Sequence, residues 1–281
     1  MIDHFTYRLG DPSYPTALAD CPDAPRILYG RGHVPPLPSV AIVGSRAATL
    51  DGRERADAMA RALVGAGFAV VSGGAIGIDA AAHHGALAAA GATIAVLGTS
   101  LDDLYPPRNR ALLETIATRG ALLTPFPRGA PVRRGNFPRR NRIIAGLAQA
   151  VVVVEAGARS GSISTAAAAR QYGRRLLAVP HSAGAHRLVA EGATAVDTPE
   201  SLLRALAGGD TPEPIRPRAP QGAGPIERAL LGALQAEPRT IDEVAHATRL
   251  PAGRVAAGLL RLELAGAALR RANGYVRLEG L

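Results

Sequence analysis

The densest group of side chains that could do chemistry lies in the arginine-rich segment 128–142, which reads RGAPVRRGNFPRRNR. As a charge run alone this segment could be a solvated loop, but Phe137 stands between two pairs of arginines. Guanidinium groups bind phosphates, and an aromatic ring among them can stack on an unpaired base. The segment therefore predicts contacts with single-stranded nucleic acid. The expected contact residues are Arg133, Arg134, Asn136, Phe137, Arg139, Arg140, Asn141 and Arg142.

Five short apolar runs along the chain are each followed by a loop that combines glycine with serine or threonine. Glycine lets backbone N–H groups converge on an anion, and a hydroxyl adds a donor beside the positive end of a helix dipole. Glycine can also serve only close packing of strand and helix. Several such loops together nevertheless suit a ligand with several phosphates in a row. The expected contacts are Gly44, Ser45, Arg46, Ser72, Gly73, Gly74, Arg159, Ser160, Gly161 and Ser162.

The apolar runs predict the strands that position these loops, because they are apolar on both faces, as in a parallel sheet buried between helices. Alanine-rich helical patterns separate them, at Arg53–Val64, Asp79–Ala89 and Ser164–Arg170. This alternation indicates an α/β fold, an extended Rossmann-like doubly wound parallel sheet whose carboxyl edge collects the loops. The five runs are Val40–Val43, Ala69–Val71, Thr93–Leu97, Val151–Val154 and Leu176–Val179.

The chain divides into four segments. Residues 1–38 contain seven prolines and predict an extended lead-in that packs on the Rossmann-like body, residues 39–207. Residues 208–224 are rich in proline and glycine and predict a flexible linker. Residues 225–281 predict a small C-terminal winged-helix domain. Its elements are the helices Pro225–Ala236, Thr240–Thr248 and Ala252–Ala265, and a hairpin at Ala267–Leu278 that turns at Asn273-Gly274.

The composition narrows the classes of function. A formal net charge of +9 suggests a polyanionic partner. The sequence contains no lysine, which excludes a Walker-type phosphate loop and Schiff-base chemistry. The single cysteine, Cys21, excludes a disulfide framework and a CxxC zinc site. Because no run of eighteen apolar residues occurs, we expect a soluble, cytoplasmic protein without membrane contact.

The titratable residues predict no catalytic set and no metal site. We expect the Asp79 carboxylate to cap a helix start. Glu155 is expected to orient the loop that carries Arg159 by an ion pair. A dinucleotide cofactor needs a GxGxxG loop after the first strand, whereas this chain has Gly44 followed by Ser45 and Arg46. We therefore expect a binding protein without a cofactor.

Several motifs resemble those of the DNA-processing protein A family (DprA/Smf). They are VAIVGSR, VVSGGAIGIDAAAHHGAL, TIAVLGTSLDDLYPPRN and NFPRRNRIIAGLAQAVVVVEAGARSGSISTA. The resemblance implies a homodimer with a basic pocket for single-stranded DNA that helps to load the recombinase RecA in natural transformation. By motif, the DNA contacts would be Arg46, the Ser72–Gly74 loop, and Phe137 with its neighbouring arginines. The tail resembles the winged-helix domain appended to many members.

Two other functions fit parts of the pattern. Related Rossmann-like enzymes that hydrolyse nucleoside monophosphates use a PGG-x-GT-x-x-E loop, but the loop EAGARSGSISTA lacks the double glycine and the glutamate. A transcription regulator would read DNA through the helix Ala252–Ala265, which offers only Arg254 and Arg261 as basic residues. We therefore expect the tail to make protein contacts or to stabilise a dimer.

Overall fold

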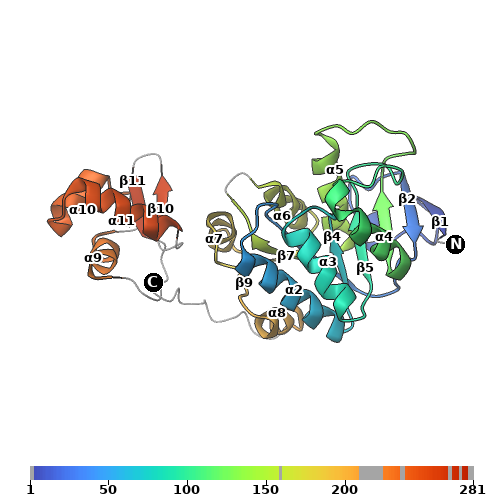
Figure 1. Cartoon of the computed structure of the whole chain (residues 1–281), viewed down its shortest axis with the longest axis horizontal. Coiled ribbons are helices and arrows are strands. Elements are labelled where there is room, and N and C mark those ends of the chain that lie inside the picture. Colours follow the sequence, from blue (N-terminus) through green and yellow to red (C-terminus); the bar gives the residue numbers. More distant parts are fainter. Residues whose placement is uncertain are drawn as a thin grey trace.

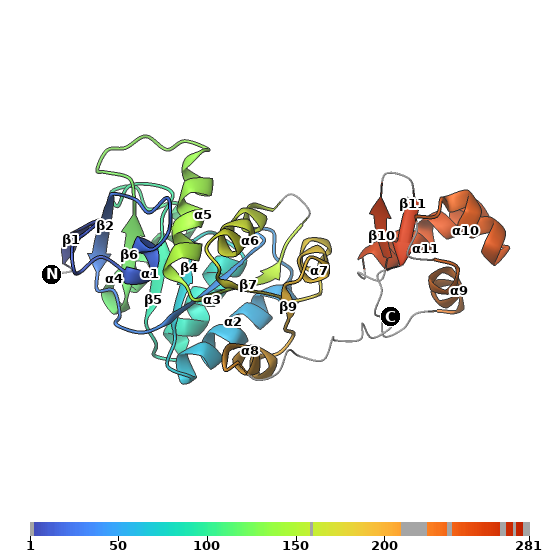
Figure 2. The ribbon, with the colours of Figure 1, turned by 180° about the vertical axis from the view of Figure 1, so that it is seen from behind.

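A computed structural model describes residues 3–157, 160–208, 224–234, 238–264, 268–271 and 274–277. Its larger part is built on a nine-stranded sheet in the order β1-β2-β6-β5-β4-β3-β7-β8-β9 (Figures 1 and 2). Strands β3 to β9 run parallel, whereas β1 and β2 are antiparallel to their neighbours. The strands span His4–Arg8, Ile27–Gly32, Ser39–Gly44, Ala69–Ser72, Thr93–Val96, Ala121–Thr124, Ala150–Glu155, Arg175–Ala178 and Thr194–Ala195.

The expected doubly wound, Rossmann-like sheet is confirmed. Each of the five apolar runs forms a strand, namely β3, β4, β5, β7 and β8. Strands alternate their side chains between two cores: Ala41 and Val43 of β3 face one, and Val40 and Ile42 face the other. Because both faces are covered, these strands are apolar at successive positions.

Helices cover both faces of the sheet (Figures 1 and 2). The core on one face takes residues from α1, α5, α6 and α7. The cores on the other face take residues from α2, α3, α4 and α8. In chain order these helices are α1 (Thr16–Ala19), α2 (Leu50–Gly65), α3 (Ile78–Ala88), α4 (Arg110–Arg119), α5 (Asn136–Leu147), α6 (Gly161–Gln171), α7 (Ala183–Ala190) and α8 (Pro199–Leu206).

The N-terminal segment is part of the sheet, so the prediction of an extended lead-in packed on the body was wrong. Strand β2 pairs with β6, with Tyr29 opposite Thr124, and β1 completes that edge of the sheet. Leu28 is fully buried in the core below α5. A Cβ at Gly30 would lie 2.0 Å from the Phe5 ring, so the ring packs directly against the glycine backbone. Prolines flank these strands without interrupting their pairing.

The tail forms a three-helix unit followed by a hairpin, as the sequence predicts for a winged helix. Its core includes Leu230, Val244, Leu259 and Tyr275. Thr240 begins the second helix with a capping box, in which its backbone N–H donates to the Glu243 carboxylate at 2.7 Å. The elements are α9 (Pro225–Ala233), α10 (Ile241–Thr248), α11 (Ala252–Leu264), β10 (Ala268–Arg271) and β11 (Gly274–Arg277).

Two sequence-based expectations lie outside the described residues. They are the turn residue Asn273 of the predicted hairpin and most of the predicted linker, residues 209–223. None of the helices in the described residues is both long enough and apolar enough to cross a membrane.

One buried histidine ties α3 to the sheet. His83 is completely buried, and its Nδ1 lies 2.7 Å from the hydroxyl of Thr93. Because that hydroxyl donates its own hydrogen to the Val70 carbonyl oxygen, at 2.8 Å, Nδ1–H must be the donor to Thr93. Burial lowers the pKa of His83 from 6.5 to about 3, and the neighbouring charges of His84 and Arg140 act in the same direction.

This burial predicts that the free energy of unfolding falls as the pH is lowered from 6.5 towards about 3. In that range the unfolded chain binds a proton at residue 83 and the folded chain does not, so stability is lost at up to about 1.4 kcal/mol per pH unit. His83→Asn keeps a donor towards Thr93 and should make the slope shallower by the contribution of His83, as measured by urea unfolding at several pH values. The exposed neighbour provides the control, His84→Asn, which should keep it. A His83→Asn profile parallel to that of the wild type would contradict the prediction.

Candidate nucleic-acid interface

The loop after β3 and the first turn of α5 meet at the carboxyl edge of the sheet. The guanidinium carbon of Arg46 lies over the Phe137 ring, 5.3 Å from its centroid. The ring of Tyr105 lies 6.2 Å from that of Phe137, tilted by 57°. Arg46 is exposed and Phe137 is partly buried. We refer to Arg46, Phe137 and Tyr105 as the aromatic platform. Sequence reasoning found its first two members and missed Tyr105, which is 44% exposed.

Phe137 lies in a helix, although no helical period was expected around it. The helix begins at Asn136, so Pro138 falls in its first turn, where a backbone N–H has no helical partner to lose. The ring packs on the loop after β5, because a Cβ at Gly98 would lie 2.7 Å from the ring carbon Cδ1 of Phe137. The Phe137 ring therefore packs against Gly98, and the Arg46 guanidinium lies over the ring.

Arg140, which the sequence predicts as a nucleic-acid contact, holds α5 to the sheet. Its side chain is only 4% exposed. Its Nη1 donates to the Val96 carbonyl oxygen at 2.8 Å and to the carbonyl oxygen of Gly73. These two carbonyls lie at the ends of β5 and β4. Because burial desolvates the guanidinium, it lowers the pKa of Arg140, although Asp79 nearby opposes the shift.

The Asp79 carboxylate also hydrogen-bonds to the loop after β4, and it does not cap α3 as expected. It is buried, and it accepts from the Ala75 backbone N–H at 3.4 Å. A Cβ at Gly73 would meet both Arg140 and the Asp79 carboxylate, so this glycine lies between the two groups. Burial raises the pKa of Asp79, and the charge of Arg140 counteracts that effect most strongly.

The expected phosphate contacts of the Ser72–Gly74 loop are not available, because all three residues are buried. The Ser72 hydroxyl donates to the Ile42 carbonyl oxygen at 2.6 Å, and the Asn109 amide donates to the Gly74 carbonyl oxygen at 2.9 Å. These bonds stabilise the strand ends. The prediction was wrong here because the glycines in this loop allow neighbouring side chains to pack close to the backbone.

A pocket of about 580 Å³ lies beside the aromatic platform. The loops after β3, β4 and β7 surround it, together with α5 and the start of α6. At its edge the Ser160 side chain accepts from the Ser162 backbone N–H and so caps α6. The Asn141 amide crosses from α5 and donates to the Gly161 carbonyl oxygen at 3.1 Å. Eight of the expected contact residues line this pocket: Gly44, Ser45, Arg46, Arg140, Asn141, Ser160, Gly161 and Ser162.

The backbone that carries Arg46 is fixed by the loop before α3. Gly77 adopts a φ of +83°, which is unfavourable for other residues. Its backbone comes so close to the loop after β3 that a Cβ would lie 2.2 Å from the Ser45 carbonyl oxygen. The Ile78 N–H donates to the same oxygen at 3.2 Å. Local sequence did not reveal that Gly77 positions Arg46.

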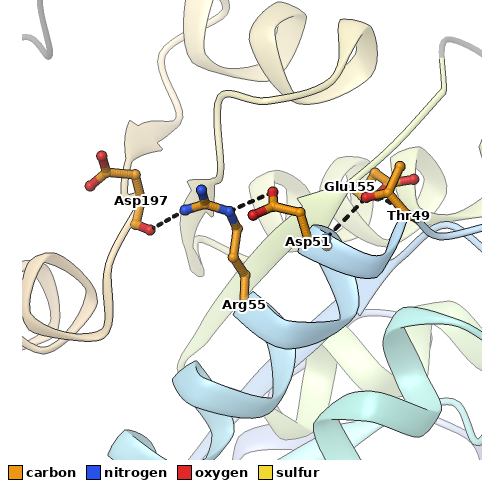
Figure 3. Close-up of polar contacts among 6 residues, drawn as sticks. Thr49, Asp51, Arg55, Glu155 and Asp197 are labelled. Carbon is orange, nitrogen blue, oxygen red and sulfur yellow. Dashed lines mark hydrogen bonds and ion pairs between the residues drawn. The ribbon is translucent and has the colours of Figure 1, made fainter. Parts of the chain in front are cut away.

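A polar network fixes the start of α2 (Figure 3). The Glu155 carboxylate accepts from the backbone N–H of Thr49 at 3.0 Å and from its hydroxyl at 2.7 Å. Arg55 pairs with Asp51 at 2.8 Å and donates to the Asp197 carbonyl oxygen at 2.8 Å. Glu155 thus supports the cap of α2. Its expected partner, Arg159, lies outside the described residues.

The other arginines of segment 128–142 point in different directions. Arg133 and Arg134 are exposed in the loop before α5, where the Asn136 amide donates to the Pro131 carbonyl oxygen at 3.2 Å. Arg139 lies over the Phe126 ring, 5.6 Å from its centroid. Arg142 forms an ion pair with Asp23 and donates to the Gln171 side-chain oxygen at 2.8 Å. Arg142, also predicted as a nucleic-acid contact, therefore ties α5 to the N-terminal segment.

In the described part of the chain, no group of three or more His, Cys, Asp or Glu side chains could hold a metal ion. Exposed Arg46, glycine backbone and serine hydroxyls line the pocket, and the aromatic platform lies beside it. These groups suit a ligand with phosphates and flat bases.

Comparisons with known proteins agree with this chemistry. A family model described as DNA recombination-mediator protein A matches residues 5–207, and a model of the DprA winged helix domain matches residues 214–274. Protein Smf from Synechocystis is 37% identical over 301 residues, which cover 91% of this chain and 75% of the relative. DprA from Streptococcus pneumoniae is 39% identical over 206 residues, which cover 70% of this chain and 73% of the relative.

Two solved structures share the fold. DprA from Streptococcus pneumoniae superposes with a TM-score of 0.68 and 38% identity, over 72% of this chain and 74% of that one. DprA from Helicobacter pylori superposes with a TM-score of 0.66 and 30% identity, over 73% of this chain and 96% of that one. That structure addresses the single-stranded DNA binding mode of the Helicobacter pylori protein. The family suggested by the motifs is thus confirmed, and the chain belongs to the DNA recombination-mediator protein A family, DprA/Smf.

Proposed function

We propose that this protein binds single-stranded DNA along the carboxyl edge of its sheet and acts as a non-catalytic mediator of recombination. The observation that carries the proposal is the placement of Arg46 over Phe137, next to a pocket of about 580 Å³. One cation and one aromatic ring from distant parts of the chain stack on each other there. Unpaired bases stack on aromatic rings and on guanidinium planes, whereas the bases of a duplex are stacked on each other.

The phosphates would follow the exposed cations and the loop amides. Arg46, Arg133 and Arg134 are exposed on this edge. The backbone of Gly44 and Ser45 lines the pocket, and α6 begins at its edge with the Ser160–Ser162 loop. The positive end of a helix dipole favours an anion.

The base position follows from how Phe137 is packed. Its ring lies on Gly98 and under Arg46, so an incoming base would stack on the Arg46 guanidinium, which Phe137 supports, and on the neighbouring Tyr105 ring. Guanidinium groups stack well because they are planar and weakly hydrated. Arg46 thus supplies both charge and a stacking surface.

Family membership supports two further parts of the proposal. The bound strand would be delivered to the recombinase RecA, and the protein would act as a homodimer. Two linked sites raise the affinity for a long strand without new contacts. The DNA-binding mode of the Helicobacter pylori relative supports single-stranded DNA as the ligand.

Binding of single-stranded DNA should depend strongly on salt, with log K falling by about 0.7 for each phosphate neutralised. Fluorescence anisotropy with a labelled oligonucleotide at several salt concentrations measures this slope. Arg46→Ala should weaken binding and reduce the slope by about one phosphate contact. Arg204→Ala removes the same charge from the exposed side of α8 and is the matched control, with an unchanged slope.

Two results would contradict the proposal. The first is an affinity that stays constant with salt, or an Arg46→Ala slope equal to that of the wild type. The second is equal binding of an unlabelled duplex and an unlabelled single strand as competitors.

A further inference from the structure

We infer that the DNA strand continues past the aromatic platform, over the first turn of α5, to a second base site formed by Phe126, Arg139 and a cavity beside β1 and β2. This inference rests on the proposed function and extends it from one base position to two. Nothing in the motifs of the sequence pointed to this cavity, because the N-terminal strands that form one wall were not predicted.

The cavity has the size and lining of a site for one base. Its volume is about 290 Å³, at the lower end of the range for small-molecule sites. Aromatic side chains and a few polar groups surround it, the usual composition of a site that orients a flat ligand. Its lining residues are His4, Phe5, Thr6, Tyr29, Gly30, Leu101, Asp102, Phe126 and Arg128.

The second site repeats the arrangement of the first. Arg139 lies over the Phe126 ring as Arg46 lies over Phe137, at 5.6 Å and 5.3 Å from the ring centroids. Arg139 is exposed, and it makes no hydrogen bond or ion pair with any of the described residues. A guanidinium that is held over a ring and has no carboxylate partner is ready to stack on a base and to contact its phosphate.

The two sites are joined through shared elements. The loop after β5 carries Gly98 under Phe137, and further along the same loop Leu101 and Asp102 line the cavity. This loop is fixed to the end of β6, because the Thr124 hydroxyl donates to the Thr99 carbonyl oxygen at 2.7 Å. The Phe126 N–H in turn donates to that hydroxyl at 3.2 Å. The first turn of α5 carries Phe137 towards one site and Arg139 towards the other.

The charges along this path suit a phosphate backbone. Residues 125–135 connect β6 to α5 and carry Arg133 and Arg134, both exposed. Arg128 extends into solvent, with 89% of its side chain exposed, and it pairs with Asp102 at 2.9 Å. This pairing offsets the negative charge of Asp102, the acid in the lining of the cavity. The Asp102 carboxylate can then accept from an N–H group on the edge of a base.

A length series tests the second site. Anisotropy titrations use the full-length protein and oligo(dT) from about 4 to about 16 nucleotides. A longer oligonucleotide can bind one site in more positions, which alone raises the affinity slightly. For the wild type, affinity should rise by more than this effect, up to the length that reaches both sites. Arg139→Ala should bind the shortest oligonucleotides like the wild type and the longest at least about fivefold more weakly. Phe126→Leu, which keeps a large apolar side chain but removes the ring, should show the same pattern, and Arg204→Ala should follow the wild type.

The possible outcomes distinguish failure of the second site from failure of the proposed function. An Arg139→Ala curve that follows the wild type at every length overturns the second site, and so does a loss of equal size at every length. If the wild type binds no oligonucleotide of any length, both the second site and the proposed function are wrong. If Arg46→Ala loses affinity at all lengths while Arg139→Ala loses none, the proposed function stands and only this extension fails.

Discussion

The arrangement of the site depends on one buried guanidinium. Arg140 lies at the centre of the carboxyl edge, and its bonds to the Gly73 and Val96 carbonyls join α5 to the ends of β4 and β5. Phe137 stands one helical turn before it on α5, so these bonds fix where the Phe137 ring lies relative to Arg46. A buried cation is stable only if the surrounding dipoles and charges compensate its lost hydration. The carbonyls of two strand ends and the Asp79 carboxylate provide that compensation.

Arginine therefore has two separate roles in a chain without lysine. Arg140 and Arg142 bind carbonyl and carboxylate groups of the protein and stabilise the position of α5. Arg46 and Arg139 lie over aromatic rings, and Arg133 and Arg134 extend into solvent from the same edge. The planar guanidinium suits both roles, since it can form several directed hydrogen bonds or stack on a ring. Charge alone does not separate the two roles, but the hydrogen-bond and ion-pair partners of each arginine do.

The sequence was sufficient for features that depend on local pattern. The apolar runs predicted the central strands, and the glycine-rich loops after them predicted that Arg46 and Phe137 would share one edge. Contacts between distant residues could not be predicted. The burial of Arg140 depends on Val96, 44 positions away. The N-terminal strands depend on pairing with β6, and β6 is only four residues long. Helix α5 was missed because Pro138 and the arginines of its first turn hide the apolar pattern that follows.

The coupling between Arg46 and Phe137 in DNA binding is the most direct measure of the aromatic platform. Dissociation constants for one single-stranded oligonucleotide are measured with the wild type, Arg46→Ala, Phe137→Ala and the double variant. If the two side chains form one stacking surface, the losses are not additive, and the coupling free energy exceeds about 0.5 kcal/mol. Losses that add to within about 0.5 kcal/mol would show that the arginine and the ring act independently, which contradicts the account.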